Sequence, residues 1–72
     1  METYLDINND SGVKAYKIGE DYITVWFNGT VQPYTYSYRK AGKNHVERMK
    51  GLARSGDGLN SYIMYYVKKL YD

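Results

Sequence analysis

The sequence predicts an α+β fold in which an antiparallel β-meander of three to four strands is followed by two helices. Two patterns support this. Apolar and polar residues alternate over 22–27, as in a half-buried strand, and Asn28-Gly29 follows as a strong signal for a hairpin turn. From Asn44 onward the apolar residues recur at helical spacing, so the second half of the chain is predicted to be helical.

The first ten residues, 1–10, are predicted to form an arm or a short strand, and residues 11–72 a single domain. The next strand is predicted over residues 13–18. Because side chains alternate along a strand, Val13 and Tyr16 are expected on opposite faces of the sheet.

A tyrosine-rich strand is predicted over residues 30–38, and its three tyrosines are Tyr34, Tyr36 and Tyr38. A two-residue turn pairs Ile23 with Tyr34, which places the three tyrosines on the core face. One extra residue at Pro33 would flip all three to the opposite face. The sequence leaves both registers open and favours partial burial of Tyr34 and Tyr36.

The first helix is predicted to begin near Asn44, with Glu47 reaching back to the free N–H groups as in a capping box. Lys50 is expected to point away from the buried stripe, which consists of Val46, Met49, Leu52 and Ala53. Gly56 is predicted to end this helix, because glycine tolerates the left-handed conformation found there. A second helix is predicted within residues 59–72, with the apolar set Leu59, Tyr62, Ile63, Tyr66, Val67 and Leu70.

Composition excludes several classes of protein. The 72 residues include no Cys and one His, so disulfides, thiolate metal sites and His-rich metal sites are excluded. The sequence has no apolar run of about 18 residues, so no membrane-spanning helix is predicted. A core this small contributes at most about 3–5 kcal/mol, so self-association into a homo-oligomer, a dimer or tetramer, is expected.

The sequence contains no pattern typical of an enzyme. His45 is the single histidine and has no evident orienting partner, and the carboxylates are scattered along the chain. The glycine-rich segment 54–60 precedes a helix, but it lacks the Lys-Ser/Thr pair and the preceding strand of a P-loop. We therefore expect no catalytic residue, no metal and no cofactor, and interpret the chain as a binding protein.

Tyrosine and positive charge are the two anomalies of composition. The chain has ten tyrosines against one Phe and one Trp, and Tyr suits half-wet contact surfaces. Residues 1–30 hold two lysines against five acidic residues, whereas residues 39–54 hold six cations against Glu47. Such a cluster suits an anionic ligand, although a solvated helix face explains it equally well.

Several short motifs follow one another along the chain: Phe27-Asn28-Gly29, Tyr34-Thr-Tyr36, Ala53-Arg-Ser55, Gly58-Leu59-Asn60 and Ile63. Together they resemble the KTSC domain, a small module named for lysyl-tRNA synthetase C-terminal segments. The similarity covers roughly residues 11–71. The gap from Phe27 to Tyr34 is one residue longer than usual, and the stretch from Ser55 to Asn60 is one shorter, which affects the tyrosine register and the helix–helix loop.

The resemblance implies two functions. KTSC domains are proposed to bind RNA, and KTSC-like phage proteins are similar to oligomeric sponges that sequester cyclic dinucleotides, such as cyclic GMP-AMP, of bacterial antiphage defence. We expect a stand-alone protein in the cytoplasm of a bacterial host, which favours the sponge. The expected roles are base stacking by tyrosines, phosphate contacts by cations, and hydrogen bonds to ribose or base, from Tyr34, Tyr36, Tyr38, Arg39, Lys40, Arg54, Ser55 and Asn60. A protein-interaction module is a third alternative, with an aromatic interface of Tyr22, Trp26, Tyr62 and Tyr65.

Overall fold

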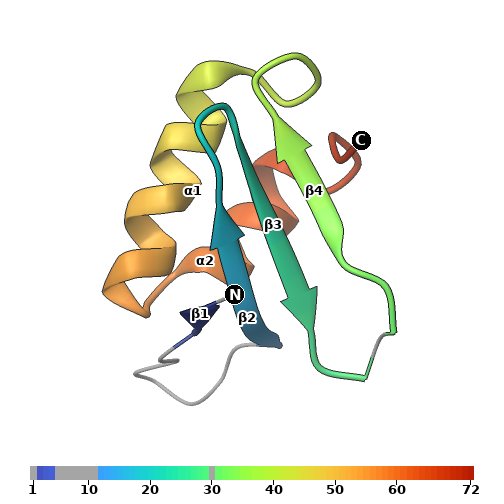
Figure 1. Ribbon diagram of the computed structural model, residues 1–72, viewed down its shortest axis with the longest axis vertical. Coiled ribbons are helices and arrows are strands. Elements are labelled where there is room, and N and C mark those ends of the chain that lie inside the picture. The colour runs from blue at the N-terminus through green and yellow to red at the C-terminus, as the bar shows by residue number, and fades with distance from the viewer. Residues whose placement is uncertain (1, 5–11, 30) are drawn as a thin grey trace.

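The computed structural model describes residues 2–4, 12–29 and 31–72 and confirms the α+β fold (Figure 1). An antiparallel sheet with strand order β1-β2-β3-β4 precedes the helical segments. The elements are β1 (Glu2–Thr3), β2 (Val13–Ile18), β3 (Tyr22–Phe27), β4 (Tyr34–Ser37), α1 (Lys43–Ser55), α2 (Leu59–Tyr62) and a π-helical turn, η1 (Ile63–Val67). Of the arm predicted over residues 1–10, β1 is seen paired with β2, and residues 5–10 lie outside the described residues.

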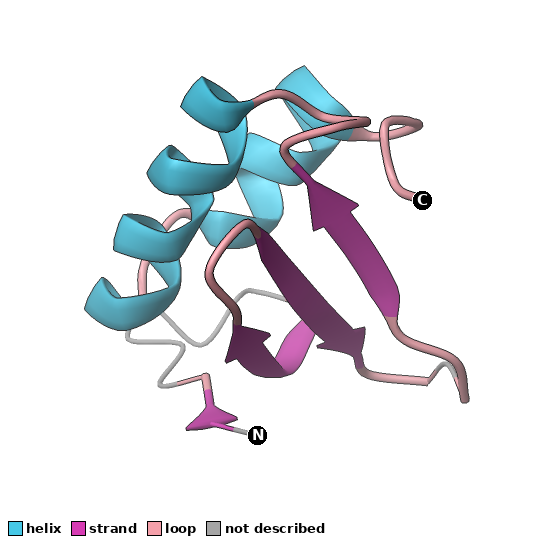
Figure 2. Ribbon diagram, turned by 45° about the horizontal axis from the view of Figure 1, so that its top comes forward, coloured by secondary structure: helices cyan, strands magenta, loops and turns pink. Residues whose placement is uncertain are grey.

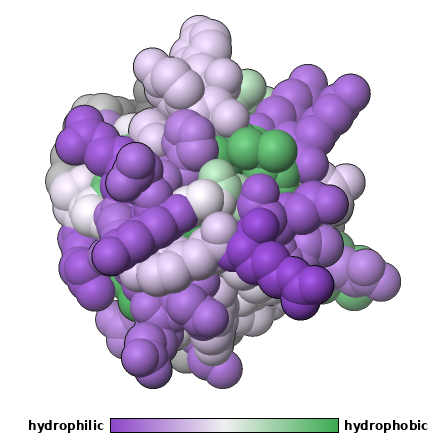
Figure 3. Space-filling view, turned by 90° about the horizontal axis from the view of Figure 1, so that it is seen from above, coloured by the Kyte–Doolittle hydropathy of each residue, from purple (hydrophilic) through white to green (hydrophobic). Residues whose placement is uncertain are grey.

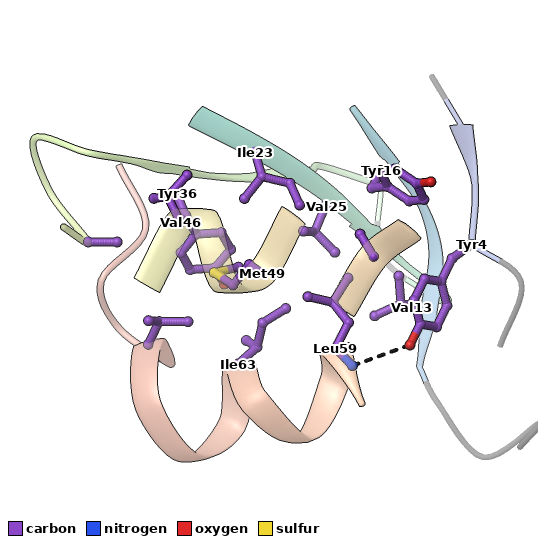
Figure 4. Close-up of a cluster of buried hydrophobic side chains, with 13 residues drawn as sticks. Tyr4, Val13, Tyr16, Ile23, Val25, Tyr36, Val46, Met49, Leu59 and Ile63 are labelled. Atoms are coloured by element: carbon purple, nitrogen blue, oxygen red, sulfur yellow. Dashed lines mark hydrogen bonds between the residues drawn. The ribbon is translucent and has the colours of Figure 1, made fainter. Parts of the chain in front are cut away.

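The helices pack on one face of the sheet and leave the other face uncovered by them (Figures 1 and 2). The core lies between the two layers, where Ile23 and Val25 of β3 meet Met49 of α1 and Leu59 and Ile63 of the last helical segment (Figure 4). All five side chains are at most 2% exposed, so this small domain does bury a dry centre.

The β3–β4 register settles the orientation of two tyrosines. Ile23 pairs with Tyr36 and Val25 with Tyr34, two residues further along β4 than a two-residue turn allows. The predicted two-residue turn at Asn28-Gly29, with Ile23 opposite Tyr34, is therefore wrong, because β4 begins only after Pro33, which has no N–H to donate. A register shift of two residues leaves each side chain on the same face of the sheet. The prediction that Tyr34 and Tyr36 face the core is therefore confirmed, and the flipped register is wrong.

The expected alternation along β2 is interrupted by a bulge. The pairing with β3 shifts between Val13 and Ala15, so that Ala15 lies opposite Trp26 and Tyr16 lies opposite Val25. Val13 and Tyr16 consequently both belong to the core cluster, and Tyr16 is 7% exposed. The prediction that they lie on opposite faces is wrong, because a bulge adds one residue to one strand and reverses the alternation beyond it.

The start of α1 differs from the prediction. Helix α1 begins at Lys43 with Gly42 as its N-cap, and no side-chain capping bond is found among the described residues. The capping box of Asn44 and Glu47 is therefore wrong. Glu47 instead accepts a hydrogen bond from Lys50 one turn along the helix, where a cation is the stronger partner. Gly56 ends α1 with a left-handed φ of 77°, as predicted.

Two side chains of the helical segments have the opposite burial from that predicted by helical spacing. Lys50 is 5% exposed and buried under the sheet's loops, although it was expected to point to solvent. Tyr66 is 60% exposed, although it was expected in the core. The wider turn of η1 keeps residues four apart, Ile63 and Val67, on the core face and rotates Tyr66 away.

Candidate ligand-binding pocket

A cavity of about 410 Å³ opens between β4 and the α2–η1 segment. Gly12, which precedes β2, and Phe27, the last residue of β3, border it near Asn28, and Lys68 and Tyr71 contribute from the segment after η1. The lining residues are Gly12, Phe27, Asn28, Tyr34, Tyr36, Asn60, Ile63, Met64, Lys68 and Tyr71. The lining is mostly apolar with a few polar groups, which is typical of small-molecule sites.

Aromatic rings form one wall of this pocket and hold one another edge to face. The ring centroids of Phe27 and Tyr34 are 5.6 Å apart, and those of Tyr34 and Tyr71 are 4.8 Å apart. Tyr36 also meets Tyr71, at 6.4 Å. Such T-shaped contacts fix the ring planes. Tyr71 is 40% exposed and Tyr34 is half-buried, so both present ring surface that a ligand can reach.

Tyr36 borders the pocket and is buried in the core. Its side chain is 1% exposed. Burial, together with Tyr34 and Tyr71 nearby, raises the pKa of Tyr36 from 10.0 to about 12. The hydroxyl is neutral at pH 7, as in an ordinary tyrosine, and the raised pKa keeps it neutral to higher pH. A neutral hydroxyl can donate as well as accept a hydrogen bond.

Two carboxamides and one ammonium bring polarity to the pocket. Asn28 follows the last residue of β3, and its backbone N–H donates to the carbonyl of Gly12 over 2.7 Å. Asn60 lies in the first turn of α2, and Lys68 follows η1. A carboxamide can donate and accept at once, and an ammonium pairs with phosphate. The pocket can therefore hold a flat, polar-edged, anionic molecule without covalent chemistry.

The predicted site residues divide into those in this pocket and those elsewhere. Tyr34, Tyr36 and Asn60 come together here. Tyr38 does not, because its hydroxyl donates to Glu47 and its ring lies 5.4 Å from the Lys50 ammonium. That hydrogen bond is the main reason why the pKa of Tyr38 rises to about 12. Hydrogen bonds from Lys50 and then from Tyr38 hold the pKa of Glu47 below its usual value.

Arg39 and Lys40 are exposed in the loop between β4 and α1. They border a separate cleft of about 240 Å³ together with Ser37 and Asp72. Ser37 Oγ donates to the Asp72 carboxylate over 2.8 Å, and the Asp72 N–H donates to the carbonyl of Thr35 over 2.7 Å. Figure 3 views this end of the molecule, whose surface is mostly hydrophilic.

Arg54 and Ser55 lie at the C-terminal end of α1, and both are exposed. Ser55 Oγ donates to the carbonyl of Leu52 over 2.8 Å and accepts from the N–H of Asp57 over 3.3 Å. These bonds satisfy backbone groups at the helix end. Ser55 thus has a local structural role, while Arg54 interacts with the helix dipole.

Sequence reasoning did not assign Lys68, Tyr71 or Met64 to the site. Lys68 lies eight residues after Asn60, about two helical turns on, which is a signal that could have found it. Tyr71 returns to the pocket only because the chain turns after η1, where Leu70 N–H bonds to the carbonyl of Val67 over 2.8 Å. No helical periodicity predicts that position.

The aromatic interface proposed as an alternative is divided between two surfaces. Tyr22 and Trp26, both on β3, lie on the sheet face opposite the helices, because Ile23 and Val25 between them face the core. Tyr62 lies in the helical layer, where its hydroxyl is 2.8 Å from His45 Nδ1. Tyr65 is 83% exposed on η1. The sheet and the core lie between the two pairs, so the four rings do not form one surface.

Among the described residues, no group of three or more His, Cys, Asp or Glu side chains is arranged to bind a metal ion. Within the same residues, no helix has the length and apolarity needed to cross a bilayer. Comparison of the whole chain with protein-family models, with curated proteins and with solved structures found no match.

Proposed function

We propose that this chain is a non-enzymatic nucleotide-binding protein that sequesters a cyclic dinucleotide signal of bacterial antiphage defence, such as cyclic GMP-AMP. The observation that carries the proposal is the pocket of about 410 Å³ in which rings, carboxamides and one ammonium converge. Small-molecule sites in proteins have volumes of roughly 300–1,000 Å³. The pocket is therefore large enough to hold at least one nucleotide unit of such a ligand.

The chemistry of the lining suits each part of a nucleotide. A base can stack on Tyr34 or Tyr71, and such stacking contributes roughly 1–3 kcal/mol per base. The carboxamides of Asn28 and Asn60 can meet a base edge or a ribose hydroxyl, since they combine donors with an acceptor. The ammonium of Lys68 can pair with a phosphate. Each of these interactions retains the ligand without breaking a bond, as a sponge requires.

The resemblance to the KTSC domain agrees with this proposal. Six of the residues that carry it border the pocket: Phe27, Asn28, Tyr34, Tyr36, Asn60 and Ile63. Tyr36 and Ile63 belong to the hydrophobic core as well.

Self-association is part of the proposal. Met64 and Tyr71 border the pocket and are 50% and 40% exposed, so apolar surface remains uncovered at its edge. A second copy of the chain placed there would bury this surface and enclose a ligand with two bases and two phosphates. We expect fewer than one ligand bound per chain.

Binding of RNA is the second candidate. Arg39, Lys40 and Arg54 are exposed outside the pocket, where they could contact the phosphates of a longer nucleic acid. Binding through such cations releases counterions, so the affinity would fall steeply with salt. A compact ligand in a pocket with a single lysine should respond weakly to salt.

Titration calorimetry with cyclic GMP-AMP and with a short single-stranded RNA, each at about 50 mM and about 200 mM salt, separates the candidates. Saturable, weakly salt-dependent binding of the cyclic dinucleotide would support the sponge. Salt-sensitive binding of RNA alone would favour the second candidate. Absence of saturable binding across a panel of cyclic dinucleotides at micromolar concentrations would refute the proposal.

Matched variants locate the site. Lys68→Ala should weaken binding about tenfold or more, because hydrogen bonds to charged groups contribute roughly 1.5–3 kcal/mol. Its neighbour Lys69 is exposed and does not border the pocket, so Lys69→Ala is the control. Tyr71→Ala should remove a stacking surface, whereas Tyr65→Ala removes an exposed ring outside the pocket. Equal effects within either pair would exclude this pocket as the site.

A further inference from the structure

The N-terminal arm, residues 2–4, reaches across the domain to the start of α2. Tyr4 is 4% exposed, and its ring belongs to the core cluster. Its hydroxyl accepts a hydrogen bond from the backbone N–H of Leu59 over 3.2 Å (Figure 4). The two residues are 55 positions apart in the chain, so this bond is a tertiary contact between the residue after β1 and the start of α2.

This bond satisfies a donor that the helix itself leaves free. Leu59 is the first residue of α2, and the first N–H groups of a helix have no partner within the helix. The N-cap residue is Gly58, which has no side chain to accept the bond. Leu59 is 0% exposed, so water does not replace a lost partner there. The Tyr4 hydroxyl therefore holds the first turn of α2 in place.

The pocket depends on the position of that turn. Asn60 follows Leu59 directly and lines the pocket, so any shift of Leu59 moves the Asn60 carboxamide. The arm is itself anchored on β2, because Tyr4 N–H donates to the carbonyl of Lys14 over 3.2 Å. Gly12, directly before β2, accepts the hydrogen bond from the Asn28 backbone N–H described above. The N-terminal part of the chain thus supports both carboxamides of the pocket.

We propose that Tyr4 is a positioning residue of the ligand pocket, which acts through Leu59 to orient the Asn60 side chain toward the ligand. This inference rests on the proposed function, because Asn60 matters only where a ligand binds. Tyr4 does not touch the pocket itself, since it is not among the lining residues. Its hydroxyl sets affinity for the part of the ligand that Asn60 contacts, while its ring contributes to the core.

The test compares Tyr4→Phe with Tyr16→Phe. Both changes remove one hydroxyl and keep a buried ring, since Tyr16 is 7% exposed in the same core cluster. With cyclic GMP-AMP as the probe, Tyr4→Phe should weaken binding about fivefold to tenfold, a typical effect of one hydrogen bond. Tyr16→Phe should leave the affinity within about twofold, the usual range for a change away from the site.

A double-mutant cycle separates positioning from general loosening of the fold. In an Asn60→Ala background, Tyr4→Phe should cause no further loss of affinity, because the group that it orients is already absent. If the two losses instead multiply, Tyr4 acts independently of Asn60 and the inference is wrong. Tyr16→Phe in the same background provides the reference for an unrelated core change.

Measurements without ligand decide the inference even if cyclic GMP-AMP does not bind. In the nuclear magnetic resonance spectrum, Tyr4→Phe should shift the Asn60 side-chain amide and speed hydrogen exchange at the Leu59 amide. Unchanged signals at both residues would overturn it, independently of the proposed function. If Tyr4→Phe fails to fold, hydrogen exchange in the parent protein takes its place. A Leu59 amide that exchanges as fast as an unprotected amide would also overturn the inference.

Discussion

Replacing Lys50 by Met tests whether the buried ammonium stabilises the fold. Lys50 is 5% exposed and connects three elements. Its Nζ donates to the carbonyl of Glu20 in the β2–β3 turn over 3.0 Å and to Glu47 Oε2 on α1 over 2.8 Å. It also lies 5.4 Å from the centre of the Tyr38 ring, after β4. Met keeps most of the apolar stem, so the change removes the charge and both hydrogen bonds.

The expected loss follows from the surroundings of the two acceptors. The Glu47 side chain is 46% exposed, so its carboxylate regains water, and an exposed ion pair contributes only about 0–1 kcal/mol. The Glu20 carbonyl loses a charged donor, and such bonds contribute roughly 1.5–3 kcal/mol before water compensates. We expect Lys50→Met to lower the free energy of unfolding by about 1–2 kcal/mol. For a domain of this size the melting temperature should fall by about 5–15 °C.

Urea and thermal unfolding followed by circular dichroism measure this change. Lys69→Met is the matched control, because Lys69 is exposed and should change stability by no more than about 0.5 kcal/mol. A Lys50→Met variant that is as stable as the parent, or more stable, would refute the reasoning. It would mean that desolvation of the ammonium offsets its hydrogen bonds, as for many buried ion pairs.

Three further predictions concern pH and backbone conformation. Burial raises the pKa of Tyr36 from 10.0 to about 12, so the unfolded chain ionises first and the free energy of unfolding should fall as pH rises through this window. In urea titrations, the free energy of unfolding of Tyr36→Phe should fall less over the same pH range. Hydrogen bonds from Lys50 and a neighbouring tyrosine lower the pKa of Glu47 below 4.5, so the stabilisation that the Glu47 carboxylate provides should be lost as pH drops below that value. The free energy of unfolding of Glu47→Gln should lack this part of the fall at acid pH. Gly56→Ala should lower stability by about 1–2 kcal/mol in the same assay because of its left-handed φ of 77°, whereas Gly51→Ala inside α1 should not.

Much of the secondary structure could be predicted because local patterns and local geometry agree. The alternation over 22–27 became β3, and Gly56 ends α1. The face of Tyr34 and Tyr36 was also predicted, since apolar and aromatic residues two apart favour the core side. These features depend on neighbouring residues and on the preference of backbone conformations, which a sequence pattern records directly.

The candidate site was only partly predictable. Tyr34, Tyr36 and Asn60 come together in the pocket, whereas Arg39 and Lys40 lie in a separate cleft. Adjacency in the sequence suggested that rings and cations act together, but the chain turns directly after β4 and carries the cations away from the rings. The cation that does border the pocket is Lys68, from the other end of the chain.

The order of sheet and helices, the strand over 22–27 and the glycine that ends α1 follow from sequence patterns alone. The choice between the two tyrosine registers, the bulge that turns Tyr16 inward, the burial of Lys50 and the contact of Tyr4 with Leu59 are set by the tertiary structure. The reason is the distance along the chain over which the interactions act. Turns and alternation arise from neighbouring residues, whereas a bulge, a buried ammonium or a hydrogen bond 55 residues apart forms only where distant segments offer the matching group.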